Sequence, residues 1–340
     1  MWFADARAAG PASILWPYAG YLHLIPRSIA VLEAALPTAA APLVGTLITL
    51  AIIAGVAVAG FRVWPPLALP VVLLPNTVVE IGSPTYLHFY LAIALLFGLL
   101  ARRVGRPGLV GLVVCSISGP SGLLLSPLFA ARAWVRRDRD SVQRLLCVAI
   151  PAAVQALFLA VAGRSAVAEA VSPVDALVIG AGHVAATIIG TRFTLAGLNA
   201  VPTPIAGVAV LAIAVLLVVA ARSVPRWLNA ALAYILIVTV ISTILAGSDD
   251  REHLLSPVSA PRYFHLAGAA VAGLSLFALS RGSRAGLVLV GLLIFGWIGD
   301  FRLEALPPSA WASDSSCLDS PGPCTVPVYP GGKWDIHWPP

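Results

Sequence analysis

The stretch PLVGTLITLAIIAGVAVAGF, from Pro42 to Phe61, contains no charged residue and is followed at once by Arg62. The hydrocarbon core of a bilayer is about 30 Å thick and is crossed by roughly 20 apolar residues in an α-helix. This stretch is therefore predicted to be a membrane-spanning helix, and the same criterion can be applied along the rest of the chain.

The composition extends that prediction to the whole protein. Of its 340 residues, 59% are hydrophobic and 11% are charged, with a mean hydropathy of +0.93. Soluble domains carry about 25% charged residues, so we expect an all-α polytopic membrane protein. The net charge of +6 comes almost wholly from arginines placed between apolar runs. Nucleic-acid binding is not expected, because such modules gather their positive charge on one solvated face.

Further apolar runs give about ten predicted crossings, with the crossing of Val63 to Val79 left open. Residues 174–190 are apolar, rich in glycine and contain His183, and are predicted to be re-entrant or interfacial. Two half-spans separated by Gly119-Pro120 are predicted to form a shielded hairpin. The runs are 86–100, 109–118 with 123–135, 145–162, 205–221, 227–246, 262–279 and 287–299.

Charge placement predicts the orientation. The arginine groups at 102–106, 132–144, 222–226 and 281–284 fall on one side, which the positive-inside rule makes cytoplasmic. Three regions follow: 1–40 as an extracytoplasmic loop and interfacial helix, 41–299 as the transmembrane bundle, and 300–340 as an extracytoplasmic tail. Both termini then lie outside. Because the first residues do not resemble a signal peptide, we expect a further span upstream of this sequence.

The cysteines fit this orientation. Cys317 and Cys324 bracket a short Pro/Gly loop in the tail, where an oxidising compartment favours a disulfide; two free thiols are the alternative. Cys115 and Cys147 lie in apolar runs and are predicted to be small buried side chains. With no further Cys or His at ligand spacing nearby, no zinc site is predicted.

Polar and aromatic side chains gather just before the first span, in Trp16 to Arg27. Arg27 follows a proline there, and Arg262 stands in a similar Pro-Arg-Tyr-Phe-His run. A guanidinium can bind a phosphate through two parallel hydrogen bonds, so both arginines are candidate phosphate ligands; snorkelling to the interface is the alternative. The aromatic and histidine candidates for a substrate pocket on the same side are Tyr18, Tyr21, His23, Tyr86, His88 and Tyr263.

Acidic residues on the same side are candidates for a general base, the group that removes a proton from a reacting hydroxyl. Asp5 precedes the aromatic passage, Glu33 follows it, and Glu80 stands in the polar loop before Tyr86. For Asp5 a solvated position near the terminus is the alternative, and for Glu33 it is an interfacial position on an amphipathic helix.

Several short motifs resemble those of bacterial membrane proteins related to the GT-C glycosyltransferases. They are Pro17 to Arg27, Tyr86 to Leu91, Gly119-Pro120, Ser126 to Leu128, Pro261 to Phe264, and Val326 to Trp334. The resemblance implies a GT-C-like helical bundle in the bacterial cytoplasmic (inner) membrane. It also implies transfer of a sugar from a polyprenyl-phosphate donor to a glycan or lipid acceptor of the envelope, at the outer face, with or without a divalent metal.

In the family that these motifs resemble, the base lies in the first outer loop after the first span. The resemblance thus implies Asp5 as the base, with Glu33 or Glu80 as substitutes, although the preceding span is missing from this sequence. Two other functions stay open. One is a lipid or glycan transporter or flippase with a discontinuous helix at Gly119-Pro120, and the other is a non-catalytic membrane protein of envelope assembly.

Overall fold

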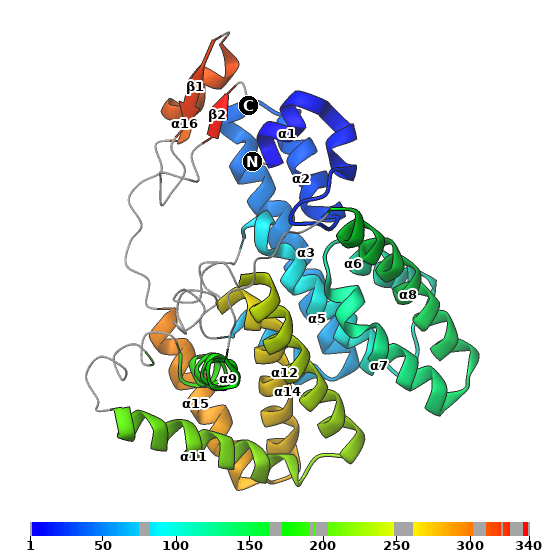
Figure 1. Ribbon diagram of the computed structural model, residues 1–340, viewed down its shortest axis with the longest axis vertical. Coiled ribbons are helices and arrows are strands. Elements are labelled where there is room, and N and C mark those ends of the chain that lie inside the picture. Colours follow the sequence, from blue (N-terminus) through cyan, green and yellow to red (C-terminus); the bar gives the residue numbers. More distant parts are fainter. Residues whose placement is uncertain are drawn as a thin grey trace.

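The structure is a computed structural model that describes residues 2–74, 82–162, 172–190, 194, 203–247, 261–301, 311–320, 322–326 and 336–338. It is mostly helical (Figure 1). Glu80 and the loop 248–260 lie outside these residues, as does the side chain of Arg262, although its backbone belongs to the turn Pro261–Phe264.

Short helices precede the first long one. They are α1 (Trp2–Ala9), η1 (Gly10–Leu15), α2 (Leu24–Ala34) and η2 (Thr38–Ala40). α3 (Ala41–Val63) then covers the predicted span. The following run, whose crossing was left open, is not one helix. Pro65 and Pro70 stand in the first turns of two short elements, η3 (Pro65–Ala68) and α4 (Leu69–Val72). Proline favours the first turn of a helix and interrupts its interior.

The next group surrounds the predicted hairpin. It comprises η5 (Pro84–Tyr86), α5 (Leu87–Leu100), α6 (Arg106–Ile117), α7 (Ser121–Arg136) and α8 (Arg139–Val161). The chain breaks between α6 and α7 at Ser118 to Pro120, where the break was predicted. Asp138 caps the start of α8, because its carboxylate accepts a hydrogen bond from the Ser141 amide at 2.7 Å. This N-cap bond satisfies one of the amides that a helix start leaves free.

The third group is α9 (Pro173–Ile189), α11 (Thr203–Ala221), α12 (Arg226–Gly247), η6 (Pro261–Phe264), α14 (His265–Ser280) and α15 (Arg284–Asp300). In Figure 1, α9 is seen end-on while α12, α14 and α15 run across the view. α9 therefore lies at a steep angle to these three helices. α11 passes across α15 as well, although a simple crossing was predicted for it.

The C-terminal residues form a small cap (α16, η7, β1 and β2). α16 (Trp311–Asp314) and η7 (Ser315–Asp319) lead to β1 (Cys324–Val326), which pairs with β2 (Ile336–Trp338) in an antiparallel sheet. Figure 1 shows the cap beside α1. The fold is thus mostly helical, as predicted, and the predicted cap adds a small two-stranded sheet. A disulfide joins Cys317 and Cys324, the pair for which the sequence favoured one.

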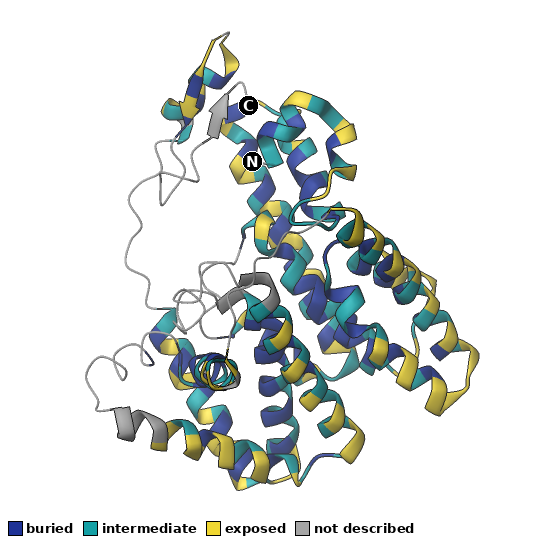
Figure 2. Ribbon diagram, in the orientation of Figure 1, coloured by how far each residue is buried: buried dark blue, intermediate teal, exposed yellow. Residues whose placement is uncertain are grey.

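Three helices of the described ranges are long and apolar enough to cross a membrane: Thr38–Val63, Arg139–Val161 and Arg226–Ile244. The other apolar helices there have 10–17 residues, so the ten predicted crossings are matched only in part. Figure 2 shows exposed residues along the outer faces of these helices. Many are large and apolar, including Leu157 at 63% exposure and Ile237 at 60%. Such faces are typical of association with lipid or another apolar partner.

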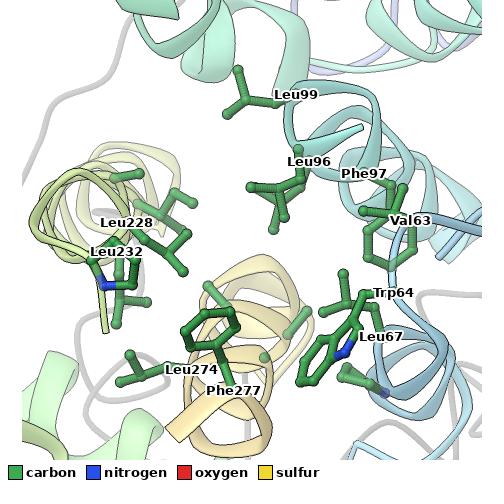
Figure 3. A pocket seen from close by; sticks show the side chains of 18 of the residues that line it. Val63, Trp64, Leu67, Leu96, Phe97, Leu99, Leu228, Leu232, Leu274 and Phe277 are labelled. Atoms are coloured by element: carbon green, nitrogen blue, oxygen red, sulfur yellow. The ribbon is translucent and has the colours of Figure 1, made fainter. Parts of the chain in front are cut away.

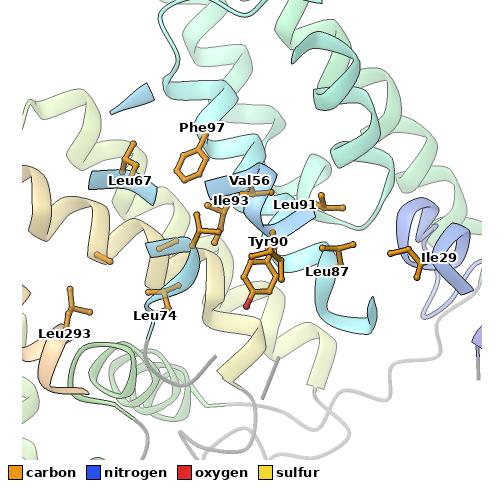
Figure 4. Packing of buried hydrophobic residues seen from close by; sticks show 14 residues of the cluster. Ile29, Val56, Leu67, Leu74, Leu87, Tyr90, Leu91, Ile93, Phe97 and Leu293 are labelled. Carbon is orange, nitrogen blue, oxygen red and sulfur yellow. The ribbon is translucent and has the colours of Figure 1, made fainter. Parts of the chain in front are cut away.

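α5 lies at the centre of the packing. Its buried side chains Leu87, Tyr90 and Ile93 contact residues of α3, α4 and α14 (Figure 4). At its C-terminal end, Arg144 of α8 donates hydrogen bonds to the carbonyls of Gly98 and Ala101 at 2.9 and 2.7 Å. A cation there is favoured by the helix dipole. The N-terminal end of α5 reaches the site described next.

Candidate functional site

A tight turn at Tyr18 to Tyr21 begins the site. The two tyrosines exchange backbone hydrogen bonds of 3.0 and 3.2 Å, and the residues between them, Ala19 and Gly20, have φ angles of +52° and +84°. Two successive positive φ values define the type I′ turn. Gly20 also packs against α8, where an added Cβ would lie 3.1 Å from Leu159. The turn thus directs the chain into the protein at His23.

The imidazole of His23 is 1% exposed and lies among aromatic rings that we call the His23 box: Trp2, Tyr18, Tyr21 and His88, with centroids 4.8–5.8 Å away. Within the described part of the chain, neither ring nitrogen of His23 has a hydrogen-bond partner. Burial, and then the positive charges of His88 and Arg27, lower its pKa from 6.5 to about 2. His23 is therefore neutral, with one nitrogen able to donate and one able to accept a hydrogen bond.

An ion pair lies next to the box. Arg27 Nη1 donates to Asp5 Oδ2 and to the Ser13 carbonyl, both at 3.1 Å, and the guanidinium lies 5.9 Å from the Trp2 ring. The Arg27 side chain is 3% exposed, whereas that of Asp5 is 24% exposed. Asp5 Oδ1 makes no hydrogen bond to the described residues, so this carboxylate is held at one oxygen and open at the other.

Gln155 of α8 holds the aromatic passage in place, and the sequence analysis missed it. Its fully buried amide accepts from the Leu22 amide at 2.8 Å and donates to the Leu22 carbonyl at 3.0 Å. It also donates to the carbonyls of Ile117 and Gly119 at 2.8 and 3.3 Å. The sequence did contain a signal for it: Gln155 is a polar residue inside the predicted span 145–162, and an amide there needs hydrogen-bond partners within the protein.

The break between α6 and α7 forms another wall. Ser118 Oγ accepts a hydrogen bond from the Ile25 amide at 3.3 Å. A Cβ added at Gly119 would lie 3.2 Å from that of His88, so the glycine lets backbone approach the box closely. The break at Gly119-Pro120 thus lies at the site, and Ser118 is 93 residues along the chain from its partner Ile25.

The cap holds the other face of α1. Asp319 accepts hydrogen bonds from Thr38 Oγ1 at 2.6 Å and from Arg7 Nη2 at 3.0 Å, and these partners lower its pKa. Trp311 Nε1 donates to the Thr38 carbonyl at 2.8 Å. Apolar contacts join Ala4 of α1 to the cap residues Leu318, Cys324 and Val326. The helix that carries Asp5 is therefore fixed from both sides.

The remaining predicted residues fall into two groups. Tyr263 lies 6.2 Å from the ring of Phe89, which is itself 3.9 Å from His88, so the start of α14 adjoins the box. Tyr86 lies in the turn just before α5. Glu33, about 120° around α2 from Arg27, instead packs against Gly45 of α3. Burial raises its pKa from 4.5 to about 7.

The site can act on a substrate with hydroxyl groups. It combines a partly exposed carboxylate, a neutral buried imidazole with two unused hydrogen-bonding positions, and several rings that can stack on a sugar. In the described ranges, no three His, Cys, Asp or Glu side chains converge on a position that could hold a metal ion.

Comparison of the chain with protein-family models, curated proteins and solved structures gives no match. The functional argument therefore depends on the residues themselves.

Proposed function

We propose that this protein is a membrane glycosyltransferase of the GT-C type, which moves a sugar from a polyprenyl-phosphate donor to an envelope glycan or lipid. The observation that carries the proposal is the His23 box beside the Asp5–Arg27 pair. Buried polar atoms normally have partners, and the unused nitrogens of His23 favour a polar ligand in the box. The surrounding rings favour a sugar, whose apolar faces stack on aromatic side chains.

Asp5 is the proposed general base. The acceptor hydroxyl attacks the anomeric carbon of the donor sugar, the bond from that carbon to the phosphate oxygen breaks, and the polyprenyl phosphate leaves with the electron pair. Asp5 Oδ1 takes the hydroxyl proton. Arg27 holds Oδ2 at 3.1 Å, which orients the carboxylate in the way that a third group orients the base of a catalytic triad.

The leaving phosphate needs a cation. Arg262 is the proposed partner, because Tyr263 and the start of α14 adjoin the box through Phe89. Phosphate binding by Arg27 stays a prediction, although its Nη1 is already shared between Asp5 and Ser13. Glu80 stays the substitute base, and Glu33, which faces α3, is a weaker one.

The proposed site faces the extracytoplasmic side of the bacterial cytoplasmic membrane, and both visible termini lie there. Two features support this placement. The cap over α1 contains the Cys317–Cys324 disulfide, and stable disulfides are typical of oxidising compartments. The arginines of 102–106 and 132–144 both stand at the end of helices α5 to α8 that is away from the His23 box. The positive-inside rule makes that end cytoplasmic.

The test is donor turnover by the full chain in lipid nanodiscs, with a radiolabelled polyprenyl-phosphate sugar and an envelope extract as acceptor. Asp5→Asn is expected to lower turnover at least about 100-fold, because the asparagine amide cannot take the proton. Asp314→Asn is the matched control, since it removes a cap carboxylate whose one hydrogen bond to the described residues comes from its neighbour Ser313; its turnover is expected to equal that of the wild type.

Equal turnover by the Asp5→Asn and wild-type proteins would disprove the role of Asp5. Absence of any turnover in the wild type, together with ATP-independent movement of the donor across the bilayer, would favour a flippase instead.

A further inference from the structure

A separate apolar groove lies between four helices at the other end of α5. It has a volume of about 190 Å³ and is lined by residues of α3, η3, α5, α12 and α14, every one of them apolar or aromatic. Figure 3 shows Leu96 and Phe97 on one side, Leu228 and Leu232 on another, and Phe277 with Trp64 below the space that they surround. We call this space the Phe277 groove.

The groove is distant from the proposed active site. Leu99 lines it, and His88 of the His23 box stands 11 residues earlier on the same helix. At 1.5 Å per residue, the two are separated by about 17 Å along α5. The groove therefore belongs to the basic end of the bundle and not to the end that carries the cap.

Two arginines adjoin residues of the groove, and neither forms an ion pair with the described residues. The guanidinium of Arg281 lies 5.5 Å from the ring of Phe277, and Arg226 stands between the groove residues Pro225 and Trp227. Both arginines are exposed, and no carboxylate of the described residues forms an ion pair with either. Trp227 is itself 63% exposed, as is common for tryptophans at the membrane interface.

We propose that the Phe277 groove holds one acyl chain of an anionic phospholipid, and that Arg281 and Arg226 bind its phosphate. An acyl chain matches a lining that is apolar or aromatic throughout, and a phosphate matches two exposed guanidinium groups that form no ion pair with the described residues. Basic clusters beside membrane helices at the cytoplasmic side bind anionic headgroups in this way. The proposal does not depend on glycosyl transfer, because it uses no residue of the His23 box.

The test is native mass spectrometry of the delipidated full chain in neutral detergent, titrated with phosphatidylglycerol or phosphatidylcholine of the same acyl chains. The wild type is expected to retain one phosphatidylglycerol, about tenfold more tightly than phosphatidylcholine. Arg281→Gln is expected to lose most of that tenfold preference, because a charge-assisted phosphate contact is removed. Arg137→Gln is the matched control, since Arg137 lies 5.6 Å from the ring of Trp134, away from the groove.

Ala231→Phe tests whether the groove holds the acyl chain. Ala231 lines the groove, and a phenyl ring at this position would fill it. This variant is expected to lose retention of both lipids. Equal binding of the two lipids by the wild type, or equal losses in the Arg281 and Arg137 variants, would overturn the proposal. These two outcomes do not require the Ala231 variant to fold.

Discussion

The two ends of α5 use their cations differently. At the cap end, Arg27 and Arg7 pair with the carboxylates of Asp5 and Asp319, and the second pair joins residues 312 positions apart. At the groove end, Arg226 and Arg281 have no such partner in the described ranges. The two cap-end arginines are therefore neutralised within the protein, as Arg144 is by Asp140 at the other end. Arg226 and Arg281 beside the groove are instead suited to a ligand that brings its own negative charge.

This difference suggests where each end tolerates change. The cap end depends on single polar contacts between distant segments, and removing those of Arg27 or Gln155 leaves buried groups without a partner. The groove end depends on shape and on exposed charge, so one substitution there should alter lipid binding more than folding. Three further experiments test the contrast.

The largest effect on folding is expected for Gln155→Leu. Its amide makes four hydrogen bonds to backbone groups, two of them to Leu22, and an apolar side chain would leave these groups unsatisfied. We expect the free energy of unfolding to fall by about 3 kcal/mol, and donor turnover to fall with it as the His23 box loosens.

The matched control is Asn229→Leu near the groove end, where the amide, among the described residues, donates to the nearby carbonyls of Ala221 and Val224 alone. Its loss should be about 1 kcal/mol with unchanged turnover. Denaturant titration in detergent measures both variants. Equal destabilisation would show that the two ends are not different in this respect.

A smaller effect is expected from opening the disulfide. Cys317→Ser with Cys324→Ser removes a bridge with a sequence separation of 7, and loop-closure entropy for such a loop is worth about 2.5 kcal/mol. The cap should then release α1, and thermal unfolding should begin at lower temperature. A reductant should reproduce the change in the wild type and have no effect on the double variant; a reductant-sensitive double variant would contradict the explanation.

The smallest effect concerns Glu33 and pH. Its pKa is about 7 in the folded protein against 4.5 ordinarily, so the folded state binds the proton more tightly. Stability from this group is full below pH 4.5, declines as the pH rises to about 7, and stays low above that. The total loss is about 2 kcal/mol, reduced from the full shift because the side chain is partly exposed.

Glu33→Gln should remove this decline and be more stable than the wild type at pH 8. Midpoints of thermal unfolding between pH 4 and pH 8 measure it, with Asp314→Asn as a control that keeps the slope. A slope unchanged in the Glu33 variant would show that another group titrates in this range.

Hydropathy predicted the parts of the fold that form from long apolar runs and the breaks between them. The span ending at Arg62, the break at Gly119-Pro120 and the helix through Gln155 were placed within a few residues, except that α8 starts six residues early, at Arg139. The run after Val63 was harder, because its prolines divide an apolar sequence into pieces that composition alone does not separate. Composition also did not predict that residues 203–221 pass across α15.

The site was predicted as a set of residue types more than as an arrangement. Tyr18, Tyr21, His23 and His88 were candidates, and they meet in one box. Their neighbour Trp2 was not a candidate, since α1 is placed by contacts with the cap and not by any local pattern. Pairing of Asp5 with Arg27 likewise depends on the angle between α1 and α2, which sequence spacing does not specify.

The bond between Arg7 and Asp319 also affects the order in which the protein matures. Asp319 is synthesised 312 residues after Arg7, which takes about 15–60 s at 5–20 residues per second. During that time α1 lacks the partner that fixes its outer face. Arg27 can hold Asp5 before then, but the outer face of α1 is covered only after Asp319 has been synthesised, so a chain that stops before this residue would lack one of the two sides that hold α1.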